Sequence, residues 1–257
     1  MKKKYISAVI LCGGKGTRLG VLGKKLPKTL VKVNNKPIIW YIIKFLEKNS
    51  FNHFILPVGY KGKMIKKFFK NNSDFQKIKI DIVNTGEHTS ISKRIDKIKQ
   101  KIISSEFILL NGDALFNFDV KKIFKNHMIS KSQITFLGCA TKLSYGIVGL
   151  QNGKVKSFER ETDFNAVISK KRKKFVGYVY SGISIISKNL LFKIKFKNFK
   201  NFEKEFYPKI IKKFKSSFKT INGFWHSVDN QKDLEFFKKS NNKTIHSNII
   251  QLKRYLV

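Results

Sequence analysis

The chain has 257 residues, enough for one domain with a full hydrophobic core. Its formal net charge is +38, from 54 Lys and Arg against 16 Asp and Glu. The basic residues are scattered, and no zinc finger, recognition helix or aromatic RNA-binding signature accompanies them, so a lysine-rich solvated surface is favoured over a specific nucleic-acid face.

Apolar runs alternate with amphipathic stretches, which predicts βα units around a mainly parallel sheet. The predicted strands are Ala8–Leu11, His53–Val58, Ile78–Val83, Phe107–Leu110 and Ile134–Cys139. One helix is predicted to begin near Pro37, and three more are predicted at Lys63–Lys70, Ser92–Ile103 and Val120–His127. The fold class we expect is α/β, a Rossmann-like mixed sheet flanked by helices.

The pattern changes after Tyr145, where two short apolar strands meet around Asn152–Gly153, a strong hairpin signal. A strand-rich stretch then covers Phe175–Ile186, and helices are predicted around Phe202–Phe214 and Gln231–Lys239. We expect one domain over residues 1–241, and the pattern leaves the tail, residues 242–257, unplaced.

The two cysteines form neither a metal-type pair nor a disulfide framework, and no apolar run is long enough to span a bilayer. The basic start of the chain and the apolar run behind it imitate a signal peptide, but glycines and Arg18 follow instead of a cleavage site. We therefore expect a cytoplasmic protein.

A glycine-rich loop, residues 13–18, follows the first strand. Glycine lets a ligand approach the backbone, whose N–H groups suit anionic oxygens, and Arg18 adds a fixed charge. The loop lacks the ending of a P-loop, and Leu19 stands where a dinucleotide fingerprint has its third glycine. Lysines follow at positions 24, 25 and 28, with no acid before Glu47, so the segment predicts a phosphate site rather than only a tight turn.

Asp113 ends the apolar run LLNGD, the place where α/β sheets put their ligand crevice. Beside a phosphate site, such a carboxylate suits Mg²⁺, which is typically held by carboxylates and substrate phosphates. Taken alone, Asp113 could equally cap a turn. Asp119 is better suited to capping, as the N-cap of the helix that begins at Val120.

Two further segments carry candidate polar groups. Asp229, in GFWHSVDNQKDL, could cap the helix that follows or complete a metal site with Asp113. Glu159 and Arg160 could hold a sugar hydroxyl and a phosphate, or form an exposed ion pair of little consequence. The five histidines show no metal-ligand spacing.

Together, LCGGKGTRL, LPKTLVKVNNKPIIWYIIKFL, LLNGD, SFERE and GFWHSVDNQKDL resemble the sugar-1-phosphate nucleotidyltransferases, or NDP-sugar pyrophosphorylases, over residues 8–237. Within that family, GYKGKMIKKFF, VNTGEHTSISKRIDKI and GFWHSVDNQKDL are most like glucose-1-phosphate cytidylyltransferase. The segment YSGISII is closer to uridylyl- and guanylyltransferases for other sugar phosphates.

The resemblance implies that the glycine loop binds an NTP, with Arg18 and Lys28 as catalytic residues on its phosphates. It implies a Mg²⁺ cofactor on Asp113 and Asp229, and a sugar-phosphate pocket lined by Glu159, Arg160 and Gly182. The nucleotide-binding residues that it implies are Leu11, Gly13, Gly14, Gly16, Thr17, Thr85, Gly86 and Arg94.

Three positions depart from the family's pattern. Ser92 and Lys93 replace a glycine pair before Arg94, Glu159-Arg160-Glu161 replaces Glu-Lys-Pro, and Tyr180-Ser181-Gly182 replaces a triplet such as Asn-Gly-Gly. The first departure bears on the nucleobase, and the other two bear on the sugar.

The expected partners are an NTP and a sugar 1-phosphate, with CTP and glucose 1-phosphate favoured and GTP or UTP as the alternative. An ionised phosphate attacks another phosphate, so no general base and no Ser/His/Asp triad are needed. The competing hypothesis from another class is a polyanion-binding protein without catalysis. We expect no specific nucleic-acid partner and no transmembrane segment, and a homo-oligomer is left open.

Overall fold

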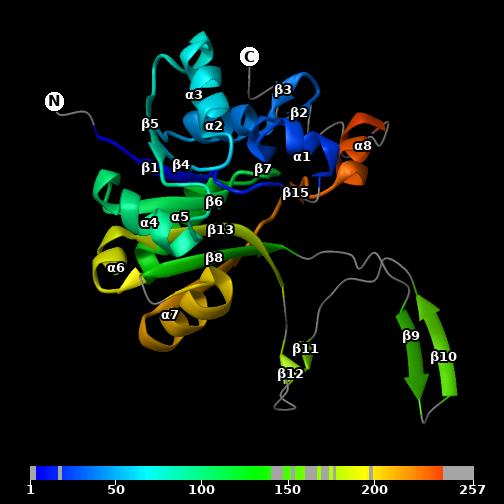
Figure 1. Ribbon diagram of the computed structural model, residues 1–257. Helices are drawn as coiled ribbons and strands as arrows, with labels where there is room; N and C mark the ends of the chain where they lie inside the picture. Colours follow the sequence, from blue (N-terminus) through cyan, green and yellow to red (C-terminus); the bar gives the residue numbers. More distant parts are fainter. Residues whose placement is uncertain are drawn as a thin grey trace.

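The computed structural model describes residues 4–16, 19–139, 147–151, 154–159, 167–168, 174–175, 178–196 and 199–239. Its centre is a seven-stranded sheet in the order β14-β8-β13-β6-β1-β4-β5 (Figure 1). The strands are β1 Ser7–Leu11, β4 His53–Val58, β5 Lys79–Asn84, β6 Glu106–Asn111, β8 Ile134–Cys139, β13 Val179–Ser187 and β14 Ser216–Thr220.

Within the sheet, β13 runs against both of its neighbours, and the other neighbouring pairs are parallel. Strand β1 lies between β4 and β6. The chain builds β4 and β5 on one side of β1 and then crosses to place β6 on the other side. Such a reversal of strand order opens a crevice at the carboxyl ends of the strands. The ends of β1 and β6 are therefore where a site is expected.

Helices cover both faces of the sheet (Figure 1). They are α1 Val21–Lys25, α2 Ile38–Lys48, α3 Gly62–Lys70, α4 Ile91–Ile98, α5 Val120–Ser130, α6 Lys188–Phe192, α7 Tyr207–Lys213 and α8 Gln231–Lys239. Side chains alternate across the strands, so Ile10 and Leu110 pack with α2, α3 and α5, whereas Val9 and Leu109 pack with α4, α6 and α7. The mixed, mainly parallel sheet flanked by helices that the sequence predicts is confirmed.

Four small antiparallel pairs accompany the sheet: β2 Lys32–Val33 with β3 Lys36–Pro37, β7 Ala114–Asn117 with β15 Phe224–Ser227, β9 Ile147–Gln151 with β10 Lys154–Glu159, and β11 Val167–Ile168 with β12 Lys174–Phe175. The predicted hairpin is thus present as β9 and β10, although its turn, Asn152–Gly153, lies outside the described residues. The pair β7–β15 brings Asp113 and Asp229, which flank these strands, to one place.

One predicted helix is too long. The sequence predicts Ser92–Ile103, but α4 ends at Ile98 and a 3₁₀ turn, Lys99–Lys101, follows. The backbone N–H groups of Ile103 and Ser104 both bind Ser7 Oγ at 3.3 Å instead of continuing a helix. The strands β7, β14 and β15 were not predicted, because each is short and lacks a long apolar run.

Candidate active site

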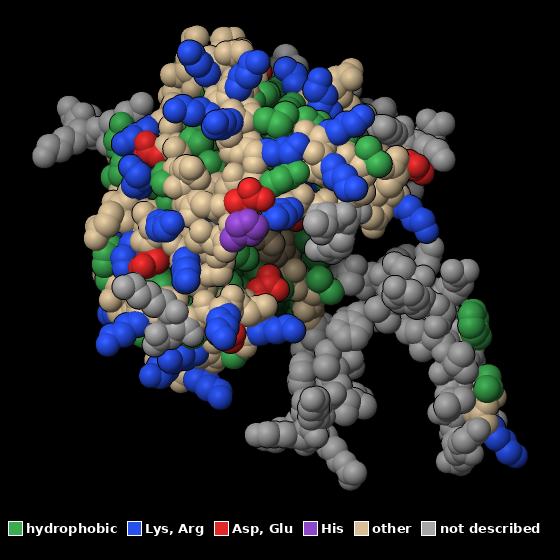
Figure 2. Space-filling model, viewed as in Figure 1, with side chains coloured by type: hydrophobic (Ala, Val, Ile, Leu, Met, Phe, Trp, Pro, Cys, Tyr) green, Lys and Arg blue, Asp and Glu red, His purple; other side chains and the backbone are tan. Residues whose placement is uncertain are grey.

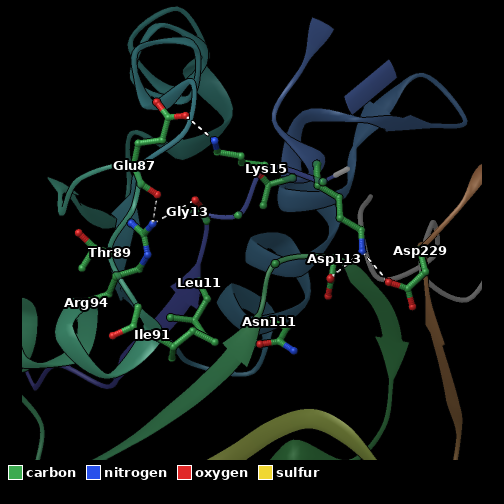
Figure 3. Close-up of a pocket in the computed structure, with 17 residues that line it drawn as sticks. Leu11, Gly13, Lys15, Glu87, Thr89, Ile91, Arg94, Asn111, Asp113 and Asp229 are labelled. Carbon is green, nitrogen blue, oxygen red and sulfur yellow. Dashed lines mark hydrogen bonds and ion pairs between the residues drawn. The ribbon is translucent and has the colours of Figure 1, made fainter. Parts of the chain in front are cut away.

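A cavity of about 470 Å³ opens where the carboxyl ends of β1 and β6 meet the segment after β5 (Figure 3). It is lined by Leu11, Cys12, Gly13, Gly14, Lys15, Gly16, Lys28, Thr29, Glu87, Thr89, Ser90, Ile91, Arg94, Asn111, Gly112, Asp113 and Asp229. The acidic pair Asp113 and Asp229 lies at one end, and Arg94 and Glu87 lie at the other (Figure 3). The cavity thus lies at the ends of β1 and β6, where the reversal of strand order in the sheet led us to expect a site.

The glycine loop forms one wall of the cavity. Of the residues that the resemblance assigns to the nucleotide, Leu11, Gly13, Gly14 and Gly16 line it. Thr17 and Arg18 lie outside the described residues. Gly16 has a φ of +62°, a backbone conformation that side chains disfavour. The loop therefore turns sharply and leaves its backbone against the cavity.

Lys28 lies between the two predicted metal ligands. Its Nζ donates to Asp113 Oδ2 at 2.7 Å and to Asp229 Oδ1 at 2.8 Å. The lysine side chain is 12% exposed and each aspartate 29%, so all three are partly withdrawn from water. Lys28 begins a short 3₁₀ turn after Pro27, Asp113 follows β6, and Asp229 follows β15, so three distant segments converge on one charged cluster.

Asp229 is not the cap of the helix that follows it. Asn230 has that role: its Oδ1 accepts the N–H of Asp233, and Asp233 Oδ2 accepts the N–H of Asn230 in return. The Asp229 carboxylate instead accepts from Ser227 Oγ and Lys28 Nζ. The capping interpretation of Asp229 is therefore wrong, and the residue instead lines the cavity. The N-cap predicted for Asp119 is confirmed by the Lys122 N–H bond at 2.9 Å.

The residues at this end fit Mg²⁺. Two carboxylates already point at a single cation, the Lys28 ammonium, and one or two carboxylates with substrate phosphates are the usual magnesium ligands. Among the described residues, no group of three or more His, Cys, Asp or Glu side chains could hold a metal by itself. A metal here would therefore depend on oxygens supplied by a ligand.

At the other end, Arg94 is buried against the loops and lines the cavity. Thr85 and Gly86, which the resemblance assigns to the nucleotide, do not line it. Thr85 is fully buried and bonds Val58 O through both its N–H and its hydroxyl. Gly86 has a φ of +98° and turns the chain toward Glu87 and Thr89, which do line the cavity.

Ser92 and Lys93, the departures from the family pattern, lie in the first turn of α4. Ser90 is the N-cap, with its hydroxyl accepting the Lys93 N–H. Ser92 is fully buried, with no hydrogen-bond partner for its hydroxyl among the described residues, and Lys93 is exposed. Neither side chain lines the cavity, where Ser90 and Ile91 stand instead.

The predicted sugar-phosphate residues are placed only in part. Arg160 and the Glu159 side chain lie outside the described residues. Gly182 has a φ of +74° and stands behind Asn111: a Cβ there would lie 2.6 Å from Asn111 Nδ2. Gly182 does not itself line the cavity, but it makes room for Asn111, which does.

The sequence reasoning did not single out several lining residues, among them Lys15, Thr89, Ser90 and Asn111. Lys15 Nζ pairs with Glu87 Oε1 at 3.2 Å across the mouth (Figure 3). A serine directly before an apolar helix is an N-cap signal, and it would have drawn attention to Ser90. Cys12 is inert, because burial and the nearby Asp113 raise the pKa of its thiol far above neutrality.

A second polar chain, Asp81–His53–Ser7, has the composition of a hydrolase triad but cannot act as one. His53 bonds Asp81 Oδ2 at 3.0 Å and Ser7 Oγ at 2.9 Å. Ser7 and His53 are both 0% exposed, and Ser7 Oγ also accepts the two backbone N–H bonds that end the α4 segment. No substrate can reach the Ser7 hydroxyl, so these three hydrogen-bonded residues stabilise the fold and do not catalyse a reaction.

Basic side chains are spread over the visible face rather than gathered into one patch (Figure 2). On this face, the described residues therefore form no single basic stripe for a polyanion, which agrees with the scatter in the sequence. Among the helices that the structure describes, none is long and apolar enough to cross a membrane.

The family model for nucleotidyl transferases matches residues 7–234. The chain belongs to this family. A probable glucose-1-phosphate cytidylyltransferase from Bacillus subtilis is 29% identical over 89% of this chain and 93% of its own length. A D-glycero-alpha-D-manno-heptose 1-phosphate guanylyltransferase from Campylobacter jejuni is 32% identical over 80% of this chain and 88% of its own length.

Solved structures show the same fold. A crystal structure of HddC from Yersinia pseudotuberculosis superposes with a TM-score of 0.67, covering 94% of this chain and 99% of that one at 23% identity. The resemblance to sugar-1-phosphate nucleotidyltransferases that the motifs carry is therefore confirmed at the level of the family. Cytidylyl- and guanylyltransferases both occur among the relatives, so the family does not select the nucleobase.

Proposed function

We propose that this protein transfers a nucleotidyl group from an NTP to a sugar 1-phosphate, releasing pyrophosphate, with CTP and glucose 1-phosphate as its preferred substrates. The observation that carries the proposal is the Lys28–Asp113–Asp229 cluster facing a glycine loop across one cavity. A site that only bound anions would gain nothing from two carboxylates among its cations.

The reaction must bring two anions together and stabilise the charge that spreads over the α-phosphate during in-line attack. The glycine loop offers backbone N–H groups to phosphate oxygens, and Lys28 offers an ammonium. Mg²⁺ held by Asp113 and Asp229 would neutralise phosphate charge. The attacking phosphate is already ionised, so the reaction needs no general base. The burial of Ser7 and His53, which keeps them away from any substrate, is therefore compatible with it.

Phosphates drawn to Lys28 leave the nucleobase at the far end, beside Lys15 and Glu87. The Glu87 carboxylate can accept a bond from the exocyclic amino group of cytosine, where uracil has a carbonyl, and this favours CTP over UTP. Lys15 can instead donate to O6 of guanine or O4 of uracil, and this supports the alternative, GTP or UTP. The guanylyltransferase relatives add support for GTP. A lost hydrogen bond in such a pocket costs about 1–3 kcal/mol.

The test is a competition. Purified protein receives CTP, UTP, dTTP, GTP and ATP together with a panel of sugar 1-phosphates, and pyrophosphate and the NDP-sugar are measured. A CDP-sugar should dominate. A dominant GDP- or UDP-sugar would overturn the choice of base and leave the reaction standing.

The polyanion hypothesis makes a different prediction. Counterion release would give tight and steeply salt-dependent binding to nucleic acid. Such binding at physiological salt, together with no pyrophosphate from any NTP, would overturn the proposed function.

A further inference from the structure

Both terminal nitrogens of the Arg94 guanidinium donate hydrogen bonds to the protein itself. Nη1 donates to Val58 O at 3.2 Å and to Thr85 Oγ1, and Nη2 donates to Gly13 O and Glu87 O, both at 3.1 Å. These four bonds use the N–H groups of both terminal nitrogens, and a guanidinium has only the Nε–H besides. A ligand could receive that one bond without displacing a protein oxygen.

Two glycines admit this side chain. A Cβ on Gly13 would lie 2.3 Å from Arg94 Cζ and 2.4 Å from Nη1. A Cβ on Gly59, in the loop after β4, would lie 2.7 Å from both terminal nitrogens and 2.6 Å from Gly86 O. Since real Cβ atoms do not approach heavy atoms so closely, neither position accepts another residue while the guanidinium is in place.

The four bonded oxygens come from three loops. Gly13 follows β1, Val58 ends β4, and Thr85 and Glu87 follow β5. The segment after β5 is fixed further by Thr89 Oγ1 and Lys97 Nζ, which both donate to Thr85 O. A buried network whose bonds are all satisfied is rigid. Arg94 therefore connects the glycine loop on one wall of the cavity to Glu87 and Thr89 on the other.

We propose that Arg94, admitted by Gly13 and Gly59, is a positioning residue that sets the width of the nucleobase end of the cavity. This inference rests on the proposed function and deepens it. It changes the role that the resemblance gave Arg94, from a group that contacts the nucleotide to one that holds the loops that do. It also gives Gly59, which does not line the cavity, a part in nucleotide binding.

The test compares R94K and G59A with the control G62A. Lysine keeps the charge but cannot make four bonds to separate oxygens. Alanine at position 59 displaces the guanidinium and also crowds Gly86 O, so R94K is the variant that decides the test. A Cβ on Gly62 meets Val58 Cγ2 at 2.7 Å, and Arg94 is not among its nearest atoms. G62A therefore reproduces a crowded glycine at the start of α3, with the crowding on the Val58 side chain rather than on the guanidinium.

Equilibrium binding of CTP and of GTP is measured by calorimetry, with kcat and KM alongside. R94K and G59A should weaken binding of whichever nucleotide the wild type accepts by at least about tenfold and raise KM more than they lower kcat. G62A should change the unfolding temperature and leave the dissociation constant unchanged. Adding G13A to R94A should cause no further loss, because the three nearest atoms that a Gly13 Cβ would meet all belong to Arg94.

Hydrogen exchange without nucleotide separates this inference from the proposed function. Amides of residues 85–91 should exchange faster in R94K and G59A than in the wild type and G62A. If the wild type binds no NTP, the proposed function fails while exchange still tests the positioning role of Arg94. Unchanged exchange and binding in R94K, or a loss confined to one of two nucleotides that the wild type binds, would overturn the positioning role.

Discussion

The two ends of the cavity each hold a cation in a cage of oxygens, but the cages differ. Lys28 lies between two carboxylates, which also suit a metal ion. Arg94 lies among three carbonyls and one hydroxyl, which carry no net charge. On our proposal the first cage can exchange its cation for Mg²⁺, whereas the second is built around one particular side chain.

The difference follows from the chemistry of the two cations. Burial lowers the pKa of Arg94, yet a guanidinium stays protonated at neutral pH, so neutral dipoles are sufficient partners. Its planar fork also fixes the directions of the bonds, as a spacer between loops requires. An ammonium is a compact charge with rotatable donors, and Lys28 can turn toward phosphates when they arrive.

The largest expected effect is at the exchangeable cage. Asp113→Asn and Asp229→Asn each remove charge without changing shape and should lower kcat/KM by at least about a hundredfold, since metal and phosphate charge would be poorly balanced. Turnover is measured across a Mg²⁺ titration. Asp119→Asn, at the N-cap of α5, is the matched control and should leave turnover unchanged. Near-normal turnover of D113N or D229N at limiting Mg²⁺ would exclude a metal role for that residue.

The second expected effect separates the cages directly. Lys28→Met leaves two carboxylates facing each other, so the unfolding temperature should fall without metal and recover with Mg²⁺ and an NTP, whose phosphate oxygens complete the metal's ligands. Ligand present at a hundred times its dissociation constant stabilises by about 2.7 kcal/mol. Arg94→Met should also destabilise, but no added cation should restore it. Thermal unfolding of both variants is measured with the NTP alone and with the NTP and Mg²⁺, and an unfolding temperature of K28M that does not rise when Mg²⁺ is added would contradict the exchangeable cage.

Much of the exchangeable cage could be predicted from the sequence, because its residues follow short motifs. Asp113 ends an apolar strand, Lys28 follows a glycine loop, and Asp229 precedes a helix. The resemblance assigned Lys28 to the phosphates and both aspartates to Mg²⁺. What sequence could not give was the pairing β7–β15, which brings Asp229 beside Asp113. Those strands are too short to carry a periodic signal.

The Arg94 cage was largely hidden from sequence reasoning. Its partners are mostly backbone carbonyls, and any residue type supplies a carbonyl. Gly59 begins the motif GYKGKMIKKFF, but nothing in that motif shows why a glycine is needed, since the atoms that crowd the position belong to Gly86 and Arg94, far along the chain. Contacts of this kind depend on tertiary packing, so they become visible only once the loops are placed.

The buried polar chain around His53 gives a prediction of smaller expected effect, because the charge of a histidine depends on pH. His53 lies between Asp81 and Ser7, and burial lowers its pKa below 6.5. The unfolded chain therefore binds the proton more readily, and the free energy of unfolding should fall as pH drops through about 6.5, by less than about 1.4 kcal/mol per pH unit. His226, whose pKa burial also lowers, acts in the same direction.

Urea unfolding at about pH 7.5 and about pH 5.5 measures this change. His53→Gln keeps polar groups between Asp81 and Ser7 but does not titrate, so its stability should depend less on pH than that of the wild type. An equal pH dependence in both proteins would show that His53 does not titrate differently on unfolding.

The smallest effect is expected at the mouth, where Lys15 and Glu87 form an ion pair without a cage. Their side chains are 47% and 43% exposed, so water and salt screen the attraction. A double-mutant cycle of Lys15→Ala and Glu87→Ala in urea unfolding should give a coupling below about 1 kcal/mol that shrinks further with added salt. Such a weak pair can be broken at little cost, which leaves each partner available to a nucleobase. A larger coupling that persists in salt would mean that the pair belongs with the fixed cage, and the two residues would then be poor candidates for reading the base.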